Sequence, residues 1–428
     1  MIRLYRDPLL SEPVIRRNFL LNWIDGSFFA FGMSFVPIVT VLPVFISNIG
    51  GSNLAVSMLQ VIWVIGFSLP QIFFSNYVRH LQFKKAIMLK TAFFQRLPWL
   101  LMAIVSFFLI DHITPVHGLW FFFAIFTFAA VAGAVNFPGW FDLISKITPV
   151  TLRGRLFALR AVSGAMLGII GGWSVKIILR KYAFPQNFGY LFLLASLMLT
   201  VSYLALIFLI EEKANATIKP QTFRKYVKEL PGLLSADRNF LNFLIADSFM
   251  LVGLIAQPFY VLKAIHRFNL SNDMSGTFTI VFMGGMVLWN LCSGSMGDRF
   301  GHRINLMIAS AVVFINSILA VTVQSMVFVY VIFILDALVM SMLQVSRHSI
   351  VAEFCGDKDR PTYIAVANMI TSPFILLGLA GGALANRYGY DIVFLIAGTG
   401  GLLASIWWLF MIREPRVSVS RINNIIRT

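Results

Sequence analysis

The chain has 428 residues, of which 58% are hydrophobic and only 12% are charged. Soluble proteins carry about twice that share of charged residues, so this composition excludes a soluble globular protein and indicates an all-α integral membrane protein. The net charge of +16 comes from Lys and Arg scattered through short polar segments, which excludes a nucleic-acid-binding patch and fits the topology signal of membrane proteins.

Twelve apolar runs are each long enough to cross a bilayer as a helix. We therefore predict twelve transmembrane spans, at 19–47, 53–78, 86–110, 117–145, 156–180, 188–210, 240–262, 274–296, 304–324, 326–348, 362–386 and 390–412. The first run is too long for a removable signal peptide, so we expect it to remain as the first span.

Twelve spans place both termini on the same side of the membrane. That side carries 25 Lys and Arg residues, and the opposite side carries 5. Positively charged loops stay in the cytoplasm, so we predict a multi-pass protein of the cell membrane with both termini cytoplasmic.

The two halves of the chain repeat each other. Arg17-Asn18-Phe19-Leu20 opens the first span, and Arg238-Asn239-Phe240-Leu241 opens the seventh. The same spacing pairs Ser27-Phe28 with Ser248-Phe249, so we predict two pseudo-symmetric six-helix bundles. We assign residues 1–210 and 240–428 to the bundles and the polar segment 211–239 to a cytoplasmic linker, in which residues around 221–230 could form an amphipathic surface helix.

A short polar turn joins the eighth and ninth spans, and each of its residue types has a physical role. Gly294 lets two helix backbones approach closely, and Gly301 can take a positive φ. Asp298 can accept hydrogen bonds from the exposed N–H groups at a helix start, and Arg299 and Arg303 can neutralise it or reach lipid phosphates. The alternative is a solvated loop whose charges only set the topology.

This turn resembles the signature loop of the major facilitator superfamily. Its elements are Gly294, Gly297, Asp298-Arg299, Gly301 and a final basic pair, in which His302 stands where Arg or Lys is usual. Duplicated six-helix halves are also typical of that superfamily, and the likeness covers nearly the whole chain. The resemblance implies secondary transport by alternating access, with spans 1, 4, 7 and 10 lining the central path.

Three carboxylates lie on these lining spans: Asp25, Asp247 and Asp336. Asp336 is the deepest, and no Lys or Arg lies within two turns of it on its own helix. A charged and unpaired carboxylate there is costly, so we predict that Asp336 binds a proton or substrate; a helix-packing hydrogen bond is the alternative. Asp25 and Asp247 lie nearer the cytoplasmic end and could instead form an inner gate by pairing with Lys146, Arg153 or Arg347.

Other polar and aromatic residues within the spans leave two interpretations open. Asn136, Gln257 and Gln344 could bind a ligand or could join helices, and Trp140 could form part of an aromatic wall. For three further residues we predict structural ion pairs: one for Arg96, and a local one between Asp142 and Lys146. Prolines within spans predict bends, at Pro37, Pro43, Pro70, Pro138, Pro258 and Pro373.

Several chemistries have no support in the sequence. No phosphate-binding Gly-Lys-Ser/Thr loop is present, and neither the six His nor Cys292 and Cys355 have metal-ligand spacing. We therefore expect no enzyme activity, no cofactor and no metal.

The function predicted is proton-coupled transport of a small molecule, with export of amphipathic compounds preferred. The alternatives are import of a small polar solute, or a receptor or scaffold of the same fold that does not transport. The expected partners are a substrate, protons and membrane lipids but no nucleic acid, and we expect a monomer.

Overall fold

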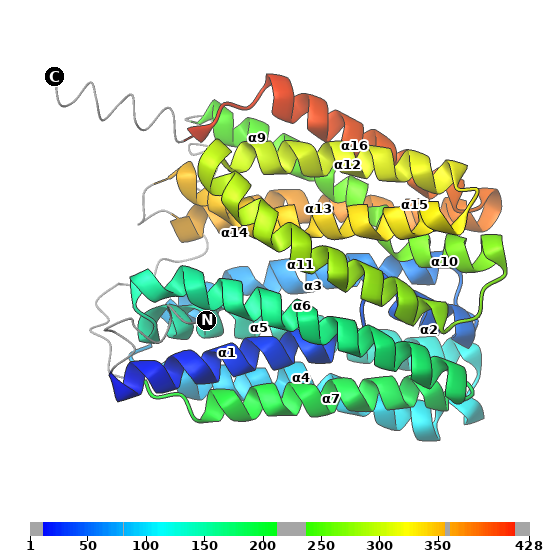
Figure 1. Ribbon diagram of the computed structural model, residues 1–428, viewed down its shortest axis with the longest axis horizontal. Coiled ribbons are helices and arrows are strands. Elements are labelled where there is room, and N and C mark those ends of the chain that lie inside the picture. Colours follow the sequence, from blue (N-terminus) through cyan, green and yellow to red (C-terminus); the bar gives the residue numbers. More distant parts are fainter. Residues whose placement is uncertain (1–11, 80, 212–236, 356–359, 416–428) are drawn as a thin grey trace. The chain divides into compact units, whose positions relative to one another are not determined.

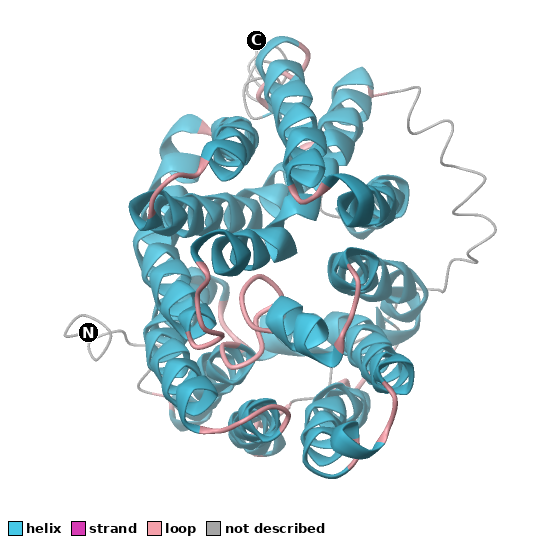
Figure 2. Cartoon of the chain, turned by 90° about the vertical axis from the view of Figure 1, so that its right-hand side faces the viewer, coloured by secondary structure: helices cyan, strands magenta, loops and turns pink. Residues whose placement is uncertain are grey.

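The computed structural model describes residues 12–79, 81–211, 237–355 and 360–415. Within these ranges the chain forms helices joined by turns and no strand, which confirms the all-α prediction (Figures 1 and 2). The predicted surface helix around 221–230 and most of the linker 211–239 lie outside the described residues.

The helices of the first half follow the predicted spans closely. They are α1 (Pro13–Met33), α2 (Leu42–Ile49), α3 (Asn53–Arg79), α4 (Lys85–Phe108), α5 (Pro115–Ile147), α6 (Val150–Lys181) and α7 (Gln186–Ile207), with a short 3-10 turn, η3 (Ile110–His112), after α4. Those of the second half are α9 (Arg238–Gly253), α10 (Gln257–Phe268), α11 (Met274–Phe300), α12 (His302–Thr322), α13 (Met326–Glu353), α14 (Arg360–Thr371), α15 (Leu377–Tyr388) and α16 (Asp391–Phe410).

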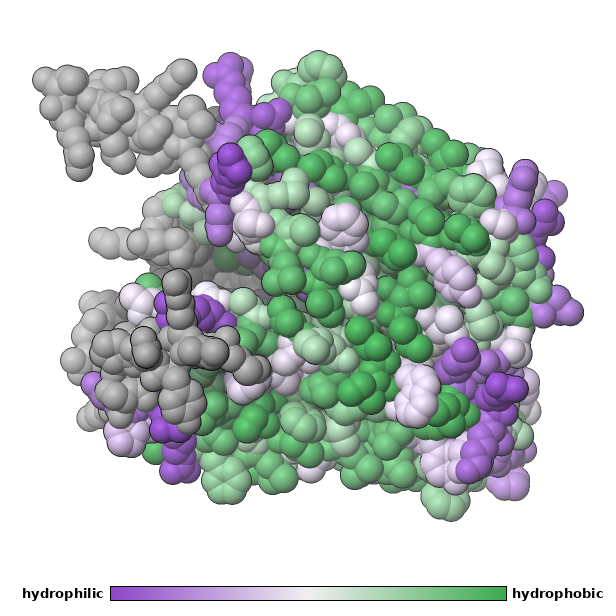
Figure 3. All heavy atoms as spheres, in the orientation of Figure 1, coloured by the Kyte–Doolittle hydropathy of each residue, from purple (hydrophilic) through white to green (hydrophobic). Residues whose placement is uncertain are grey.

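Eleven helical segments of the described chain are long and apolar enough to cross a membrane. The remaining predicted span, 19–47, is divided into α1 and α2 by turns over residues 34–41. Pro37 lies in this break, where its missing N–H removes a helical hydrogen bond. On the face shown in Figure 3, hydrophobic side chains cover the middles of the helices and hydrophilic ones gather toward their ends.

Two more of the predicted bends are confirmed, and two are not. The 3-10 segments η4 (Leu254–Ala256) and η5 (Ser372–Leu376) interrupt the seventh and eleventh spans; η4 ends just before Pro258, and η5 contains Pro373. Pro70 and Pro138 instead lie inside α3 and α5, which continue through them. A proline in a membrane helix is tolerated where neighbouring groups satisfy the freed carbonyl.

The chain divides into two compact units. Unit 1 comprises Met1–Gly51, Gly66–Gln221 and Ser271–Ile280, and unit 2 comprises Ser52–Ile65, Thr222–Leu270 and Val281–Thr428. The first part of α3 thus packs within unit 2, where a Cβ on Gly382 would lie 2.3 Å from the Ser57 hydroxyl. The first part of α11 packs within unit 1, against Gly172 of α6. The two compact units therefore do not test the predicted bundle boundaries, 1–210 and 240–428, which follow the sequence repeat and stay a prediction.

Each unit uses the same set of helix neighbours. In unit 1, α1 packs on α6 and α7, and α4 packs on α5 and α7. In unit 2, α9 packs on α14 and α16, and α12 packs on α13 and α16. This correspondence is the structural form of the sequence repeat.

Candidate functional site

Asp336 is buried in α13, with a residue exposure of 3%. One carboxylate oxygen, Oδ1, accepts a hydrogen bond from Gln257 Nε2 at 2.9 Å. The other oxygen, Oδ2, is buried and has no hydrogen-bond partner among the described residues. No Lys or Arg of the described chain forms an ion pair with Asp336, so its charge is compensated only by one amide.

Gln257 connects Asp336 to a third helix of unit 2. Its Oε1 accepts a hydrogen bond from Gln60 Nε2 at 3.1 Å, and both glutamines are buried. Gln257 begins α10 immediately after the η4 segment, so the break in the seventh span places this side chain toward α13. The sequence predicted Gln257 as a site residue but did not predict that it contacts Asp336.

Asp25 lies at the centre of a polar cluster in unit 1 and is 2% exposed. Its Oδ1 accepts from Ser202 Oγ at 2.7 Å and from Arg96 Nη2 at 3.4 Å. Its Oδ2 pairs with Arg160 Nη1 at 3.0 Å and accepts from Trp140 Nε1 at 3.3 Å. The ion pair predicted for Arg96 is confirmed, whereas neither Lys146 nor Arg153 pairs with Asp25.

Asp247 and Arg347 form a bidentate ion pair in unit 2. Arg347 Nε donates to Asp247 Oδ1 at 2.9 Å, and Nη2 donates to Oδ2 at 2.8 Å. The guanidinium also donates to Asn368 Oδ1 at 2.9 Å and to Thr371 Oγ1 at 3.2 Å. The pairing of Asp247 with Arg347, one of the alternatives from the sequence, is confirmed; its role in a gate stays a prediction.

Asn136 and Gln344, also predicted as site residues, differ in burial and in hydrogen bonding. The buried side chain of Asn136 accepts from Thr91 Oγ1 and donates to Gln95 Oε1, both at 2.9 Å, so it joins α5 to α4. Gln344 is exposed on α13 and makes no hydrogen bond to the described residues. A contact of either residue with substrate stays a prediction.

The signature turn is tighter than predicted. Helix α11 continues to Phe300 and α12 begins at His302, so the turn consists of Gly301 alone. Its φ of 91° lies in the region that favours glycine, which confirms the role predicted for this residue. A Cβ on Gly294 would meet no described atom within 4 Å, whereas one on Gly297 would lie 2.7 Å from His302 Nδ1. Among the described residues the close approach is therefore at Gly297 and not at Gly294.

The charged residues of this turn have separate roles. Arg303 donates from Nε and Nη2 to the Trp408 carbonyl oxygen at 3.0 and 2.9 Å, and from Nη2 to the Leu409 carbonyl oxygen at 2.8 Å. It thus caps the C-terminus of α16 instead of neutralising Asp298. Asp298 and Arg299 are exposed in the last turn of α11, and their function in a gate stays a prediction.

Two carboxylates that the sequence analysis missed bind the starts of α4 and α12. Glu211 accepts from the backbone N–H groups of Lys84 and Lys85 at 2.8–2.9 Å. Glu414 Oε2 accepts from the backbone N–H of Arg303 at 3.3 Å. Each acid lies just after the last helix of its half of the chain. This equivalent position in the two repeats was the sequence signal that could have identified both acids.

The local pair predicted between Asp142 and Lys146 is wrong. Asp142 pairs with Lys84, and Lys146 Nζ pairs with Glu211 Oε1 at 2.9 Å. Arg153, another predicted partner, donates instead to carbonyl oxygens near the end of α5, those of Ser145 and Thr148. Asp142 and Lys146 thus form ion pairs with residues outside their own helix, and not with each other one turn away.

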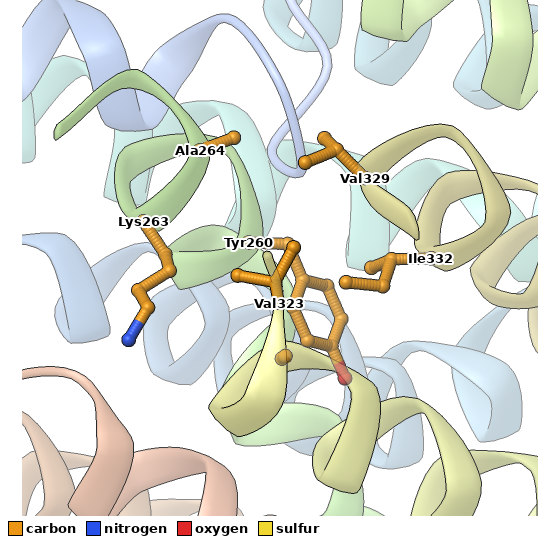
Figure 4. A pocket seen from close by; sticks show the side chains of 7 residues that line it. Tyr260, Lys263, Ala264, Val323, Val329 and Ile332 are labelled. Carbon is orange, nitrogen blue, oxygen red and sulfur yellow. The ribbon is translucent and has the colours of Figure 1, made fainter. Parts of the chain in front are cut away.

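A small pocket in unit 2 is lined by apolar side chains and by Tyr260 and Lys263 (Figure 4). Its volume of about 10 Å³ accommodates roughly one water molecule. Lys263 pairs with Asp391 Oδ1 at 2.5 Å. This pocket is too small for an organic substrate.

Comparison with known proteins identifies relatives of the fold. Residues 239–424 match the family model described as Major Facilitator Superfamily. The D-xylose-proton symporter matches with a TM-score of 0.74 and 13% identity, covering 94% of this chain and 99% of that chain. The xylose transporter XylE from E. coli, in an inward-open conformation, matches with a TM-score of 0.68 and 13% identity, over 94% and 97% of the two chains.

A further similar structure is the nucleoside transporter NupG, with a TM-score of 0.64 and 11% identity, over 94% of this chain and 99% of that chain. No curated protein matches the sequence. At these identities the structures share the fold, and the chemistry of the site has to be argued from this chain's own residues.

Proposed function

We propose that this chain, whose residues 239–424 match the Major Facilitator Superfamily model, is a proton-coupled transporter of a small amphipathic molecule that works by alternating access. We further propose that it lies in the cell membrane with both termini in the cytoplasm, as the distribution of Lys and Arg indicates. Asp336 carries the coupled proton.

The observation that carries this proposal is the missing compensation at Asp336. A buried carboxylate with one hydrogen bond and no cation is unfavourable when ionised, by several kcal/mol on typical scales. Oδ2 has no partner among the described residues, so a proton or a cationic group there would relieve this cost. The neutral form of Asp336 is therefore favoured in the buried surroundings described here, and the ionised form is favoured when a cation or water is beside it. A proton-coupling site requires such a change of stability between the two forms.

The fold is compatible with such coupling, since one similar structure is a D-xylose-proton symporter. The direction proposed for this chain is export, because the side chains on the expected lining helices are largely aromatic and aliphatic. Import of a small polar solute requires a denser set of amide and cationic side chains. Movement of substrate across the membrane distinguishes the proposed transporter from a receptor of the same fold, which binds its ligand without moving it.

The test uses the full chain in sealed vesicles with an imposed pH gradient. We expect the protein to accumulate substrate against its gradient and Asp336→Asn to abolish this accumulation, because the amide mimics the protonated acid. Exchange down the gradient should persist in the variant. Inside-out and right-side-out vesicles separate export from import.

Asp391→Asn is the matched control in the same unit, since Asp391 is half-exposed and pairs with Lys263 away from Asp336. It should accumulate substrate like the unaltered protein. An Asp336→Asn protein that still concentrates substrate would falsify the coupling role of Asp336. Binding of a ligand with no flux in any gradient would indicate a receptor.

A further inference from the structure

We propose that Arg160 in unit 1 binds the anionic group of the transported molecule, so that the substrate is an amphipathic organic anion. This inference rests on the proposed function, since it names the class of molecule that the transporter carries. The evidence comes from the hydrogen bonds of the Arg160 guanidinium, the charges around it and the aromatic rings beside it.

Arg160 uses only part of its hydrogen-bonding capacity. Its Nη1 contacts Asp25 Oδ2 and both oxygens of Asn22, the backbone carbonyl at 2.6 Å and the side-chain Oδ1. A guanidinium carries five N–H donors, and those on Nε and Nη2 have no hydrogen-bond partner among the described residues. The Arg160 side chain is 12% exposed, and neither nitrogen is among the fully buried atoms without a partner.

Arg347 shows what the same pair of nitrogens does when a carboxylate is present. In unit 2, Nε and Nη2 of Arg347 hold both oxygens of Asp247, at 2.9 and 2.8 Å. This parallel pair of donors matches the geometry of a carboxylate or phosphate. In unit 1 the corresponding nitrogens of Arg160 form no hydrogen bond to a described residue, so their N–H groups can donate to a carboxylate from outside the chain.

The charges around Arg160 favour an anion. Asp25 is the single acid in contact with Arg160 or Arg96 among the described residues, and both guanidinium groups share it. The cluster therefore holds two positive charges and one negative charge in a largely buried environment. A ligand with one negative charge would balance it and would interact strongly, because screening by water is weak there.

Aromatic rings continue from the guanidinium and supply a surface for an apolar body. The Arg160 Cζ atom lies over the Trp140 ring, 4.8 Å from its centroid. Trp140 contacts Phe137 at 5.9 Å and Phe157 at 6.3 Å between ring centroids, and Phe141, which is 48% exposed, lies 6.4 Å from both Trp140 and Phe157. A charged group beside a cluster of aromatic rings fits a molecule with an anionic head and an aromatic body.

Gly26 makes the position of Arg160 possible. A Cβ on Gly26 would lie 2.1 Å from Arg160 Nε and 2.4 Å from its Cζ. Any larger residue on this face of α1 would displace the guanidinium from Trp140 and Asp25. Gly26→Ala therefore alters the proposed site without changing its charge.

The test is calorimetric titration of the purified full chain at neutral pH with naphthoate and with naphthamide, its uncharged counterpart. We expect naphthoate to bind at least about tenfold more tightly, as one charge-assisted bidentate contact contributes on this scale. Arg160→Gln should remove the preference, whereas Arg160→Lys should leave an intermediate one because it keeps the charge but loses the paired donors. Gly26→Ala should also weaken the preference.

Lys176→Gln is the control, since it removes one positive charge from the same helix, α6, at a distance from Asp25. Its preference for naphthoate should equal that of the unaltered chain. Thermal unfolding of each variant identifies any that is misfolded. If Arg160→Gln is misfolded, Arg160→Lys, which keeps the charge beside Asp25, replaces it: an intermediate preference for naphthoate supports the inference, and an unchanged preference contradicts it. Equal binding of the two probes, no binding of naphthoate, or a preference that survives in Arg160→Gln would overturn the inference.

Binding in this assay needs no proton gradient, so the two proposals fail separately. A chain that accumulates substrate but shows no preference for the carboxylate loses only the inference about Arg160. A chain that prefers the carboxylate but moves nothing across vesicles loses the proposed transport and keeps Arg160 as the site of an anionic ligand.

Discussion

Unit 1 and unit 2 compensate their buried carboxylates in opposite ways. In unit 1, Asp25 is shared by Arg96 and Arg160, which leaves an excess of one positive charge. In unit 2, Asp247 is balanced by Arg347, and among the described residues Asp336 has only an amide partner, which leaves an excess of one acid. The same helix neighbours occur in both units, so packing requires neither excess. The unbalanced groups are therefore candidates for function: Arg160 for an anion and Asp336 for a proton.

The largest effect is expected where one acid depends on one cation. Arg347→Gln would leave Asp247, which is 3% exposed, with no cationic partner in the described part of the chain, at a cost of about 3–5 kcal/mol in the free energy of unfolding. Thermal or denaturant unfolding of the purified protein would measure this loss. The double variant Asp247→Asn with Arg347→Gln should recover much of it, because no unpaired charge remains. Unchanged stability of the single variant would contradict the comparison.

Asp25 has a second cation, so the equivalent change in unit 1 should cost less. In Arg96→Gln, the Arg160 guanidinium, Ser202 and Trp140 still bind the Asp25 carboxylate. We expect a loss of about 1–3 kcal/mol, the range for removing hydrogen bonds of a charged group. The same unfolding assay compares it with Arg347→Gln. A loss of stability larger than that of Arg347→Gln would show that the second arginine, Arg160, does not compensate for the missing Arg96 at Asp25.

Glu211, just after the last helix of unit 1, allows a test by pH. Burial alone would raise the pKa of Glu211, but hydrogen bonds from Lys146 and from the backbone of Lys84 and Lys85 outweigh it and hold this pKa below its usual value of 4.5. A carboxylate with a lowered pKa stabilises the fold above its unfolded pKa, and this contribution disappears as the pH falls through the folded pKa.

Glu211→Gln should therefore lower stability at neutral pH by about 1–3 kcal/mol and reduce the loss of stability on acidification below about pH 4.5. Unfolding curves between neutral and acid pH measure both effects. An unaltered acid dependence in Glu211→Gln would assign the effect to other carboxylates.

The smallest effect concerns the residue that differs from the usual signature. His302 Nε2 lies 3.8 Å from Glu353 Oε1, and this contact is an ion pair only when the histidine is protonated. At the corresponding place in unit 1, Lys84 pairs with Asp142. His302→Lys would make the unit 2 contact permanently charged, with a stabilisation below about 1 kcal/mol. Thermal unfolding at neutral pH would detect it, and a clear destabilisation would mean that packing beside Gly297 dominates.

Much of the architecture could be predicted because the bilayer imposes simple rules. Helix lengths follow from the apolar runs, the break in the first span follows from Pro37, and the turn between α11 and α12 follows from Gly301. The repeat opening at Arg17 and Arg238 indicated two related halves. Glu211 and Glu414 were missed because each acts on a helix far away along the chain.

The sequence by itself determined the spans, the repeat and the burial of Asp25, Asp247 and Asp336, since these depend on hydrophobic length and local periodicity. The tertiary structure alone decided the partners. Asp25 reaches Arg96 and Arg160, which are 71 and 135 positions away, while Asp142 takes Lys84 and not its neighbour Lys146. The rotation of each helix about its axis sets these pairs, and that rotation depends on the packing of all neighbouring helices, which no local sequence pattern encodes.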